Sequence, residues 1–445
     1  NKQMNYPTTA ILELHHAGIW HQAAELQALS HDRVRFSYLD SYVFGDINLP
    51  VSLTMPVGLR PAPRVQGAMG FEADHRPPSF LYDLVPQGKG RKFLLSALNL
   101  SDSDEMIMPL VMAGAFNPIG CLRISTAMDF YNQEAKKNPD PQLKDGISLD
   151  DITHRTDEFL NHISVHSMLA TGTTGVQGVA PKFLLTTDIH GRWFADMALP
   201  DDLAHEHWLV KLPRGKSDED RAVLRNEAAY LRVADAVGLR CKYAPVLRGE
   251  MLFVRRFDRQ VTPGVSGVHH LHQESLASII GQRGFGMAHS QQTLLAGIRR
   301  VVTDTAGETI EFIKRDVLNL ALRNTDNHAR NTAVQRTPEG LIQLTPLFDF
   351  APMFKDPEVV SRSCHWRDKQ GVRQTDWKQV IEQLDIPEPQ REWIAAELVQ
   401  FSETVGRLDV IARDCGVDED VIAQCAKSIE AQARQLQDIK GSSHG

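Results

Sequence analysis

The spacing of hydrophobic and polar residues changes along this chain and predicts a strand-rich start followed by a helical second half. Hydrophobic residues alternate with polar ones over residues 11–14 and 34–38, and residues 51–55 form a further short strand-like run. A period of two puts every second side chain on one face of a sheet, so we predict a small β-rich unit over residues 8–56. Residues 77–120 mix helical runs with loops, and the proline-containing stretch 136–146 predicts a linker.

The middle of the chain mixes helical and strand patterns. Residues 152–170 have helical spacing, whereas residues 183–185 and 207–212 are hydrophobic runs that predict strands. Ser217 and Asp220 resemble a capping box that opens a helix, and Gly238 suits its end. Another strand is predicted from Met251 to the polar residues around Asp258.

Beyond residue 259 the pattern is largely helical. The predicted helices cover residues 272–281, 291–304, 309–323, 377–384, 388–413 and 418–438. A chain of 445 residues exceeds what one hydrophobic core usually serves, so we expect two or three domains.

Composition excludes several classes of protein. The formal net charge of −8 provides no general basic surface for nucleic acid. No hydrophobic run approaches the roughly 20 residues of a membrane span, and the start of the sequence does not have the pattern of a secretory signal. The five cysteines are scattered without paired spacing, which favours free thiols and a cytoplasmic location.

Three polar residues in the helical half have a spacing with chemical meaning. Asn331 follows Asp326 by five positions, and Asp349 ends the hydrophobic run that begins at residue 341. Protein kinases likewise place four residues between the aspartate that acts as catalytic base and a metal-binding asparagine. A later Asp-Phe-Gly supplies another metal ligand. An aspartate can accept a hydroxyl proton, and the other two side chains offer the oxygen ligands that Mg²⁺ prefers.

That spacing alone is weak, because aspartate and asparagine are common in loops. It is strengthened by the predicted helix before the loop and by two further residues. Lys211 interrupts a hydrophobic strand, and Glu227 lies in the next predicted helix, which is the order of the lysine–glutamate ion pair of kinases. The alternative for Glu227 is an ordinary solvated helix charge.

A glycine- and threonine-rich stretch occupies residues 171–182 and ends in Lys182, just before a predicted strand. Backbone N–H groups of such a loop can hold phosphates. Turns of this composition are also common between elements, so the stretch alone leaves both interpretations open.

Two other groups of residues favour no site. His269, His270 and His272 could suggest a metal, but neighbouring histidines cannot easily point at one ion, and we expect a solvent-exposed loop. Cys364 and His365 are sequence neighbours, which rarely reach the geometry of a nucleophile and its base.

Taken in order, these stretches resemble the HipA family of serine/threonine protein kinases, the toxins of type II toxin–antitoxin systems. The matching stretches are residues 173–177 with Lys182, 210–213, 226–227, 256–259, 324–331 and 344–349. Residues 36–38 and 49–53 resemble the N-terminal subdomain of that family. The resemblance therefore spans nearly the whole chain.

The resemblance implies an α/β N-terminal half and an all-α C-terminal lobe in a two-lobed kinase-like fold that holds ATP. Its parts would be an N-terminal subdomain at residues 1–135, a region resembling a kinase N-lobe at 150–258, and a helical catalytic lobe at 259–445. Asp326 would be the catalytic base, with His328 in support, and Asn331 and Asp349 would bind Mg²⁺.

Further residues would hold the nucleotide. By resemblance, Lys211 with Glu227 would bind ATP phosphates, and Arg256, Phe257 and Asp258 would border the adenine and ribose. The nucleotide loop would contain Thr173, Thr174, Gly175, Gln177 and Lys182. Here Gln177 and Lys182 stand farther apart than is usual in the family, and threonines occupy the neighbourhood of its regulatory serine, which puts autophosphorylation in doubt.

The family also implies partners. Its members phosphorylate aminoacyl-tRNA synthetases and pair with a small helix-turn-helix antitoxin, so contact with DNA would be only indirect. Two rival functions remain at this point: a small-molecule kinase on the same scaffold, and a non-catalytic pseudokinase partner of a DNA-binding antitoxin. Intact Asp326, Asn331, Asp349 and Lys211 count against the second rival.

Overall fold

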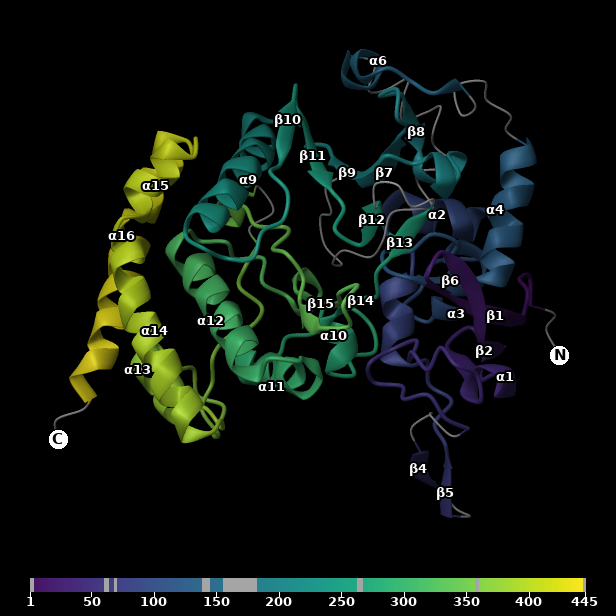
Figure 1. The fold of residues 1–445 in the computed structure, drawn as a ribbon, viewed down its shortest axis with the longest axis horizontal. Helices are drawn as coiled ribbons and strands as arrows, with labels where there is room; N and C mark the ends of the chain where they lie inside the picture. Colours follow the sequence, from purple (N-terminus) through teal and green to yellow (C-terminus); the bar gives the residue numbers. More distant parts are fainter. Residues whose placement is uncertain are drawn as a thin grey trace. The chain divides into compact units, whose positions relative to one another are not determined.

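The computed structural model describes residues 4–59, 64–67, 70–137, 145–154, 182–261, 267–356 and 360–442 (Figure 1). By compactness the chain divides into two units. Unit 1 contains Asn1–Val210, Arg255–Phe285 and Gln335–Glu339, and unit 2 contains Lys211–Val254, Gly286–Val334 and Gly340–Gly445. The three-part division expected from the sequence stays a prediction.

The first sheet of unit 1 is antiparallel and contains the alternating segments near the start of the chain. Its strands lie in the order β3 (Arg33–Tyr38), β2 (Ile19–Ser30), β1 (Thr9–His16) and β6 (Leu122–Ile124). The turn between β1 and β2 consists of Ala17 and Gly18, both with positive φ, a geometry that suits the twist of paired strands. In β3 the alternate side chains of Val34, Phe36 and Tyr38 are buried, as the period of two predicts.

Helices cover this sheet and close the core of unit 1. Helix α3 (Ile107–Gly114) is buried along its whole length and contacts α4 (Ser125–Lys137), which in turn contacts β1. Phe116 stacks on Tyr131 with ring centroids 4.7 Å apart. The other elements in this part of the chain are α1 (Asp40–Val43), β4 (Arg64–Gly67), β5 (Gly70–Ala73), η1 (Ser79–Leu84), α2 (Gly88–Ala97) and α6 (Leu149–His154).

A second group of strands in unit 1 carries the charged residues discussed below. Strands β9 (Glu206–Lys211), β7 (Lys182–Thr187) and β8 (Trp193–Ala195) are hydrogen-bonded in that order, and β12 (Arg259–Val261) pairs with β13 (Val268–His270). The remaining short elements are η2 (Asp196–Ala198), η3 (Asp201–Leu203), β14 (Gln273–Ser275) and α10 (Leu276–Ile279).

Unit 2 is mostly helical among the residues that the structure describes. Its helices are α9 (Asp218–Ala236), α11 (Gln291–Val301), α12 (Thr305–Ala321), α13 (Trp377–Gln383), α14 (Glu388–Gly406), α15 (Leu408–Asp414) and α16 (Glu419–Asp438). Helices α14 and α16 lie side by side, and both contact α12 (Figure 1). The short elements are β10 (Val246–Arg248), η4 (Ala329–Asn331), β16 (Ile342–Leu344), η5 (Met353–Lys355) and η6 (Ile439–Ser442), while β11 (Met251–Arg255) and β15 (Ala333–Arg336) begin in unit 2 and end in unit 1.

Capping residues explain where the site-bearing helices begin. Ser217 accepts a hydrogen bond from the Asp220 N–H group at the start of α9, as its sequence predicts, and Gly238 beyond the helix has φ +88°. Asp304 caps α12 by accepting from the Gly307 N–H group. These caps satisfy N–H groups that the first turn of a helix leaves free.

Three predicted elements were wrong in type or extent. Residues 51–55 form a turn because the Glu274 carboxylate accepts hydrogen bonds from Ser52 and the Leu53 N–H group, at 2.7 and 2.9 Å. The predicted helix at 272–281 is β14 followed by the short α10, which Ser275 caps. The predicted helix at 388–413 is divided between α14 and α15, where Arg407 leaves helical geometry next to Gly406.

Two broader expectations concern the cysteines and the length and polarity of the helices. All five cysteines are free thiols, as predicted. Among the described residues, the helices are too short or too polar to span a lipid bilayer.

Candidate active site

The loop after α12 brings three of the predicted catalytic residues together. The Asn331 side chain donates from Nδ2 to the Asp326 carbonyl oxygen at 2.8 Å, which closes the loop on itself. His328 Nε2 lies 3.4 Å from Asp326 Oδ1, and its Nδ1 accepts from the Arg330 N–H group at 3.2 Å. Because Nδ1 is an acceptor, a neutral His328 carries its proton on Nε2 and directs it toward Asp326.

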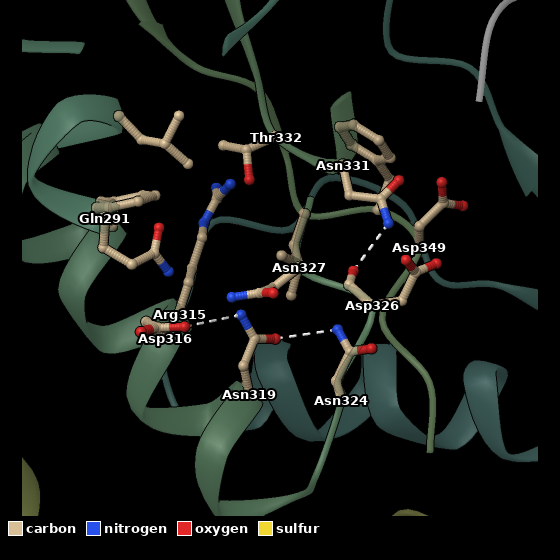
Figure 2. Close-up of a pocket in the computed structure, with 14 residues that line it drawn as sticks. Gln291, Arg315, Asp316, Asn319, Asn324, Asp326, Asn327, Asn331, Thr332 and Asp349 are labelled. Carbon is tan, nitrogen blue, oxygen red and sulfur yellow. Dashed lines mark hydrogen bonds between the residues drawn. The ribbon is translucent and has the colours of Figure 1, made fainter. Parts of the chain in front are cut away.

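Asp326, Asn331 and Asp349 line one small polar pocket of unit 2 (Figure 2). Figure 2 shows the Asp349 and Asp326 carboxylates near the Asn331 amide, at the side of the pocket away from Gln291. The donors that these residues offer to a cation are oxygen atoms only, the type that Mg²⁺ requires. The residues therefore fit a magnesium ion bound through Asn331 and Asp349.

Asp349 also belongs to a buried ion-pair cluster. Lys211, at the end of β9, donates to Glu227 Oε1 of α9 at 2.8 Å and also pairs with the Asp349 carboxylate. The Lys211 side chain is only 7% exposed. Burial disfavours its charged form, but the two carboxylates outweigh this effect and hold the pKa of Lys211 above its ordinary value.

The backbone at Asp349 is unusual. Its φ is +53°, in the left-handed region that residues other than glycine seldom adopt. The next residue, Phe350, is almost fully buried, and its ring lies 5.2 Å from that of Tyr230 in α9. Phe350 therefore anchors the segment, while the strained residue before it presents its carboxylate to Lys211 and the pocket.

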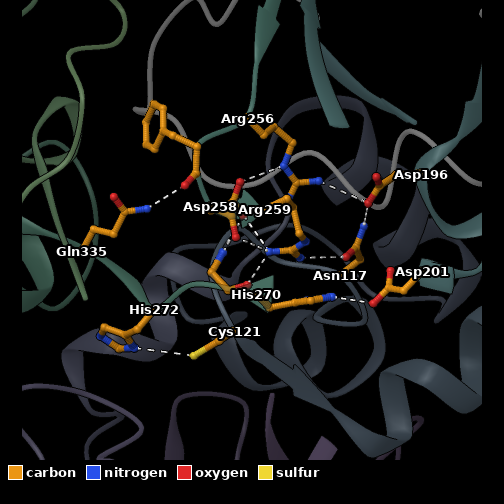
Figure 3. Close-up of polar contacts among 12 residues, drawn as sticks. Asn117, Cys121, Asp196, Asp201, Arg256, Asp258, Arg259, His270, His272 and Gln335 are labelled. Carbon is orange, nitrogen blue, oxygen red and sulfur yellow. Dashed lines mark hydrogen bonds and ion pairs between the residues drawn. The ribbon is translucent and has the colours of Figure 1, made fainter. Parts of the chain in front are cut away.

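The second predicted region, around residue 258, forms a buried charge network in unit 1 (Figure 3). The Asp258 carboxylate accepts from Arg256 at 2.9 and 2.8 Å, from Arg259 at 2.9 Å and from the Gly120 N–H group at 3.0 Å. Arg256 also contacts Asp196 at 3.2 Å. Burial raises the pKa of Asp258, but the two arginines outweigh it and hold this pKa well below its ordinary value.

Asp258 is 2% exposed, and its oxygens are already engaged by these groups. Phe257 is fixed by its carbonyl oxygen, which accepts from Gln335 at 2.8 Å. Contact of either residue with adenine or ribose stays a prediction. Lys182 begins β7 in unit 1, whereas Thr173, Thr174, Gly175 and Gln177 lie outside the described residues.

The expectation of an exposed histidine loop was wrong. His269 and His270 belong to β13, and His272 is 5% exposed. His15, Asp201 and His270 place possible ligand atoms within 4.8 Å of one another. The two imidazoles stack at 3.9 Å with 26° between their planes, however, so their lone pairs do not converge on one point as metal binding requires.

Two residues near the pocket were missed by the sequence reasoning. Asn327, inside the predicted catalytic loop (residues 322–331), forms hydrogen bonds with the backbone of Ser363 and Cys364. Asp316, on the buried face of α12, pairs with Arg362. An acid among hydrophobic helix positions was a usable signal for Asp316, whereas nothing in the local spacing points to the partner of Asn327.

Comparison with known proteins places this chain in a family. The family model of the HipA N-terminal domain matches residues 19–125, and that of the HipA-like C-terminal domain matches residues 174–405. HipA of Shewanella oneidensis MR-1, solved in complex with HipB and its operator DNA, is 17% identical with a TM-score of 0.61, covering 97% of this chain and 100% of that chain. This likeness indicates a shared fold and agrees with the predicted α/β N-terminal half and helical C-terminal lobe.

The Helicobacter pylori proinflammatory kinase CtkA was also found, at 13% identity over 60% of this chain and 92% of that chain. Its TM-score of 0.37 is too low to indicate a common fold. The match of the C-terminal domain alone spans more than half of the sequence. The chain therefore belongs to the HipA family.

Proposed function

We propose that this chain is a protein kinase that uses Mg²⁺ and ATP to phosphorylate serine or threonine, and that it is the toxin of a toxin–antitoxin module. One observation carries the proposal: Lys211 pairs with both Glu227 and Asp349, and Asp349 shares a pocket with Asp326 and Asn331. A protein that only bound a partner would have no need for this combination.

Asn331 and Asp349 would hold Mg²⁺, and Lys211 would bind the phosphates of ATP. Bound Mg·ATP supplies the phosphoryl group together with the positive charge that balances its oxygens. The raised pKa keeps Lys211 charged at neutral pH, so it can contact phosphate oxygens. Glu227 orients the lysine from α9, as the 2.8 Å contact supports.

Asp326 would receive the acceptor hydroxyl. Its carboxylate would orient the hydroxyl group and take the proton as the oxygen attacks the γ-phosphorus of ATP, while the bond from that phosphorus to the bridging oxygen breaks and ADP leaves. His328 donates toward the same carboxylate from 3.4 Å and limits its rotation, while the bond from Asn331 holds the loop closed. Both therefore position the base.

The family supports further proposals about partners. We propose a protein substrate such as an aminoacyl-tRNA synthetase, a helix-turn-helix antitoxin, and contact with DNA only through that antitoxin. The Shewanella protein was solved with HipB and operator DNA. We also propose a cytoplasmic location and autophosphorylation on a threonine of residues 171–174, which lie outside the described residues.

Radiolabelled ATP added to a cell lysate with this chain tests the proposal. A labelled protein band that depends on Mg²⁺ and disappears with Asp326→Asn is the expected result. A labelled metabolite would indicate the small-molecule kinase instead. The absence of any transfer would leave the pseudokinase.

Induction in growing cells tests the toxin role. The chain should slow growth, and the Asp326→Asn form at matched levels should not, because a catalyst acts repeatedly on its target. Equal toxicity of both forms would show that binding or aggregation causes the harm.

A further inference from the structure

One side chain of the catalytic loop binds a segment far away in the sequence. Asn327 Oδ1 accepts from the N–H groups of Ser363 and Cys364 at 2.9 and 3.1 Å, and its Nδ2 donates to the Cys364 carbonyl oxygen at 2.8 Å. The amide thus pairs with this backbone through both its donor and its acceptor, as a neighbouring strand would. Such pairing fixes the register of the segment as well as its distance.

The same segment has a second anchor on α12. Asp316 accepts from both terminal nitrogens of Arg362 at 2.8 and 2.6 Å and from Trp366 Nε1 at 2.6 Å. The Asp316 side chain is 1% exposed, and a bidentate contact at this depth is rigid. Because α12 leads directly into the catalytic loop, this contact fixes the position of the segment relative to the loop.

The start of α11 holds the other end. The Gln291 N–H group donates to the His365 carbonyl oxygen at 2.8 Å, and the Arg367 N–H group donates to Gln292 Oε1 at 2.8 Å. Residues 362–367, which we name the docking strip, are therefore held from α12, from the catalytic loop and from α11. All these contacts lie within unit 2.

The docking strip continues into a cleft of about 520 Å³. The cleft is lined by hydrophobic residues such as Leu295 and Leu384 together with polar and charged residues, among them Arg367 and Lys369. Its mixed lining offers both hydrophobic side chains and charged groups, which a polypeptide can contact through its own side chains and backbone.

We propose that Asn327 is a positioning residue that keeps the docking strip in register with Asp326, so that a polypeptide acceptor lying on the strip presents its hydroxyl to the base. The inference rests on the proposed kinase function and names its acceptor class as a polypeptide. Asn327 adjoins Asp326 in the chain, so a shift of the strip relative to Asn327 is also a shift relative to the base.

The test compares transfer to protein with the slower transfer of phosphate from ATP to water. Asn327→Ala should lower protein labelling in a lysate by roughly tenfold to a hundredfold relative to ATP hydrolysis, because small misplacements have effects of this size. Hydrolysis needs no strip, so the ratio isolates acceptor positioning. Gln370→Ala, an exposed amide in the turn beyond the strip, is the matched control and should leave the ratio unchanged.

A second variant loosens the same strip from its other anchor. Arg362→Lys keeps a cation beside Asp316 but loses the two-pronged contact, and it should lower the same ratio. Because both variants act on one strip, the double variant should lose less than the product of the single effects.

The inference is overturned if Asn327→Ala leaves the ratio of labelling to hydrolysis unchanged, or if labelling and hydrolysis fall equally. It is also overturned if a lower melting temperature accounts for both losses. Effects of Asn327→Ala and Arg362→Lys that simply multiply in the double variant would overturn it as well. Failure of the proposed function gives a different result, since the unmodified chain itself would then label no protein.

Discussion

Replacing Lys211 by methionine separates its structural role from its proposed role in binding phosphate. The ammonium group contacts Glu227 at 2.8 Å and also pairs with Asp349, and the three side chains are 7%, 6% and 14% exposed. Methionine is similar in length and has no charge. The cluster therefore changes from one cation between two anions to two buried anions with no cation.

The size of the effect follows from this geometry. Removing one partner of a buried ion pair destabilises the fold by about 3–5 kcal/mol, because the remaining charge is left without compensation. Asp349 is the most exposed of the three, so water partly solvates its unpaired carboxylate. We therefore expect a destabilisation at the lower end of this range. A loss of about 3 kcal/mol lowers the melting temperature of a unit of this size by roughly 6–12 °C.

Two companion variants sharpen the measurement. Glu227→Gln in the same chain removes one of the two anions, so the double variant should regain most of the lost stability while remaining unable to transfer phosphate. Lys216→Met changes an exposed lysine five positions further on and should shift stability by less than about 0.5 kcal/mol. Stability and transfer thus separate in the double variant.

Hydrogen exchange of the amides of α9 measures the effect within unit 2, which matters because two units need not unfold together. Exchange from α9 should be faster by about a hundredfold in Lys211→Met. The reasoning is refuted if Lys211→Met exchanges like the unmodified chain, or if adding Glu227→Gln destabilises it further.

Other predictions concern the base, the metal and two buried networks. Asp326→Asn should abolish labelling of protein yet keep Mg·ATP affinity in calorimetry; undiminished labelling would exclude it as the base. ATP should raise the melting temperature markedly only when Mg²⁺ is present, and equal stabilisation in EDTA would contradict the site. Arg256→Leu should destabilise unit 1 by about 3–5 kcal/mol in urea unfolding, because it strips a buried cation from Asp258. Burial disfavours charged His272, but its contacts with Cys121 and Glu274 outweigh this and raise the pKa of His272 to about 9. The associated stability should be complete below pH 6.5 and lost as pH rises through 9, and Glu274→Gln should weaken that dependence; a flat profile in the unmodified chain would contradict it.

Local patterns predicted much of this chain because some elements depend on neighbouring residues. The period of two in β3, the cap of α9 at Ser217 and the helix that leads to Asp326 all follow from short-range rules. The order of Lys211, Glu227 and the later acids also indicated one site. The structure brings these side chains together, and their chemical roles stay predictions.

Contacts between distant residues explain what the sequence did not predict. The Glu274 carboxylate accepts a hydrogen bond from Ser52, 222 positions away, and so holds the turn at Ser52. The local hydrophobic run around Ser52 gives no sign of this contact. His270 is covered by stacking on His15 of β1, so its exposure depends on a strand near the start of the chain. Asn327 looks like an ordinary loop residue until its partners 36 and 37 positions away are known.

The way the chain passes between the two units affects how it can fold during synthesis. Unit 1 needs residues up to Glu339, while unit 2 begins at Lys211 and ends with α16, which packs on α12 and α14. A ribosome adds residues in order, so α16 emerges after the helices α12 and α14 on which it packs. On a nascent chain, the core of unit 2 that contains the Lys211 cluster can therefore close only after α16 has emerged, and the isolated fragment 211–445 would expose the segment 255–285 that belongs to unit 1.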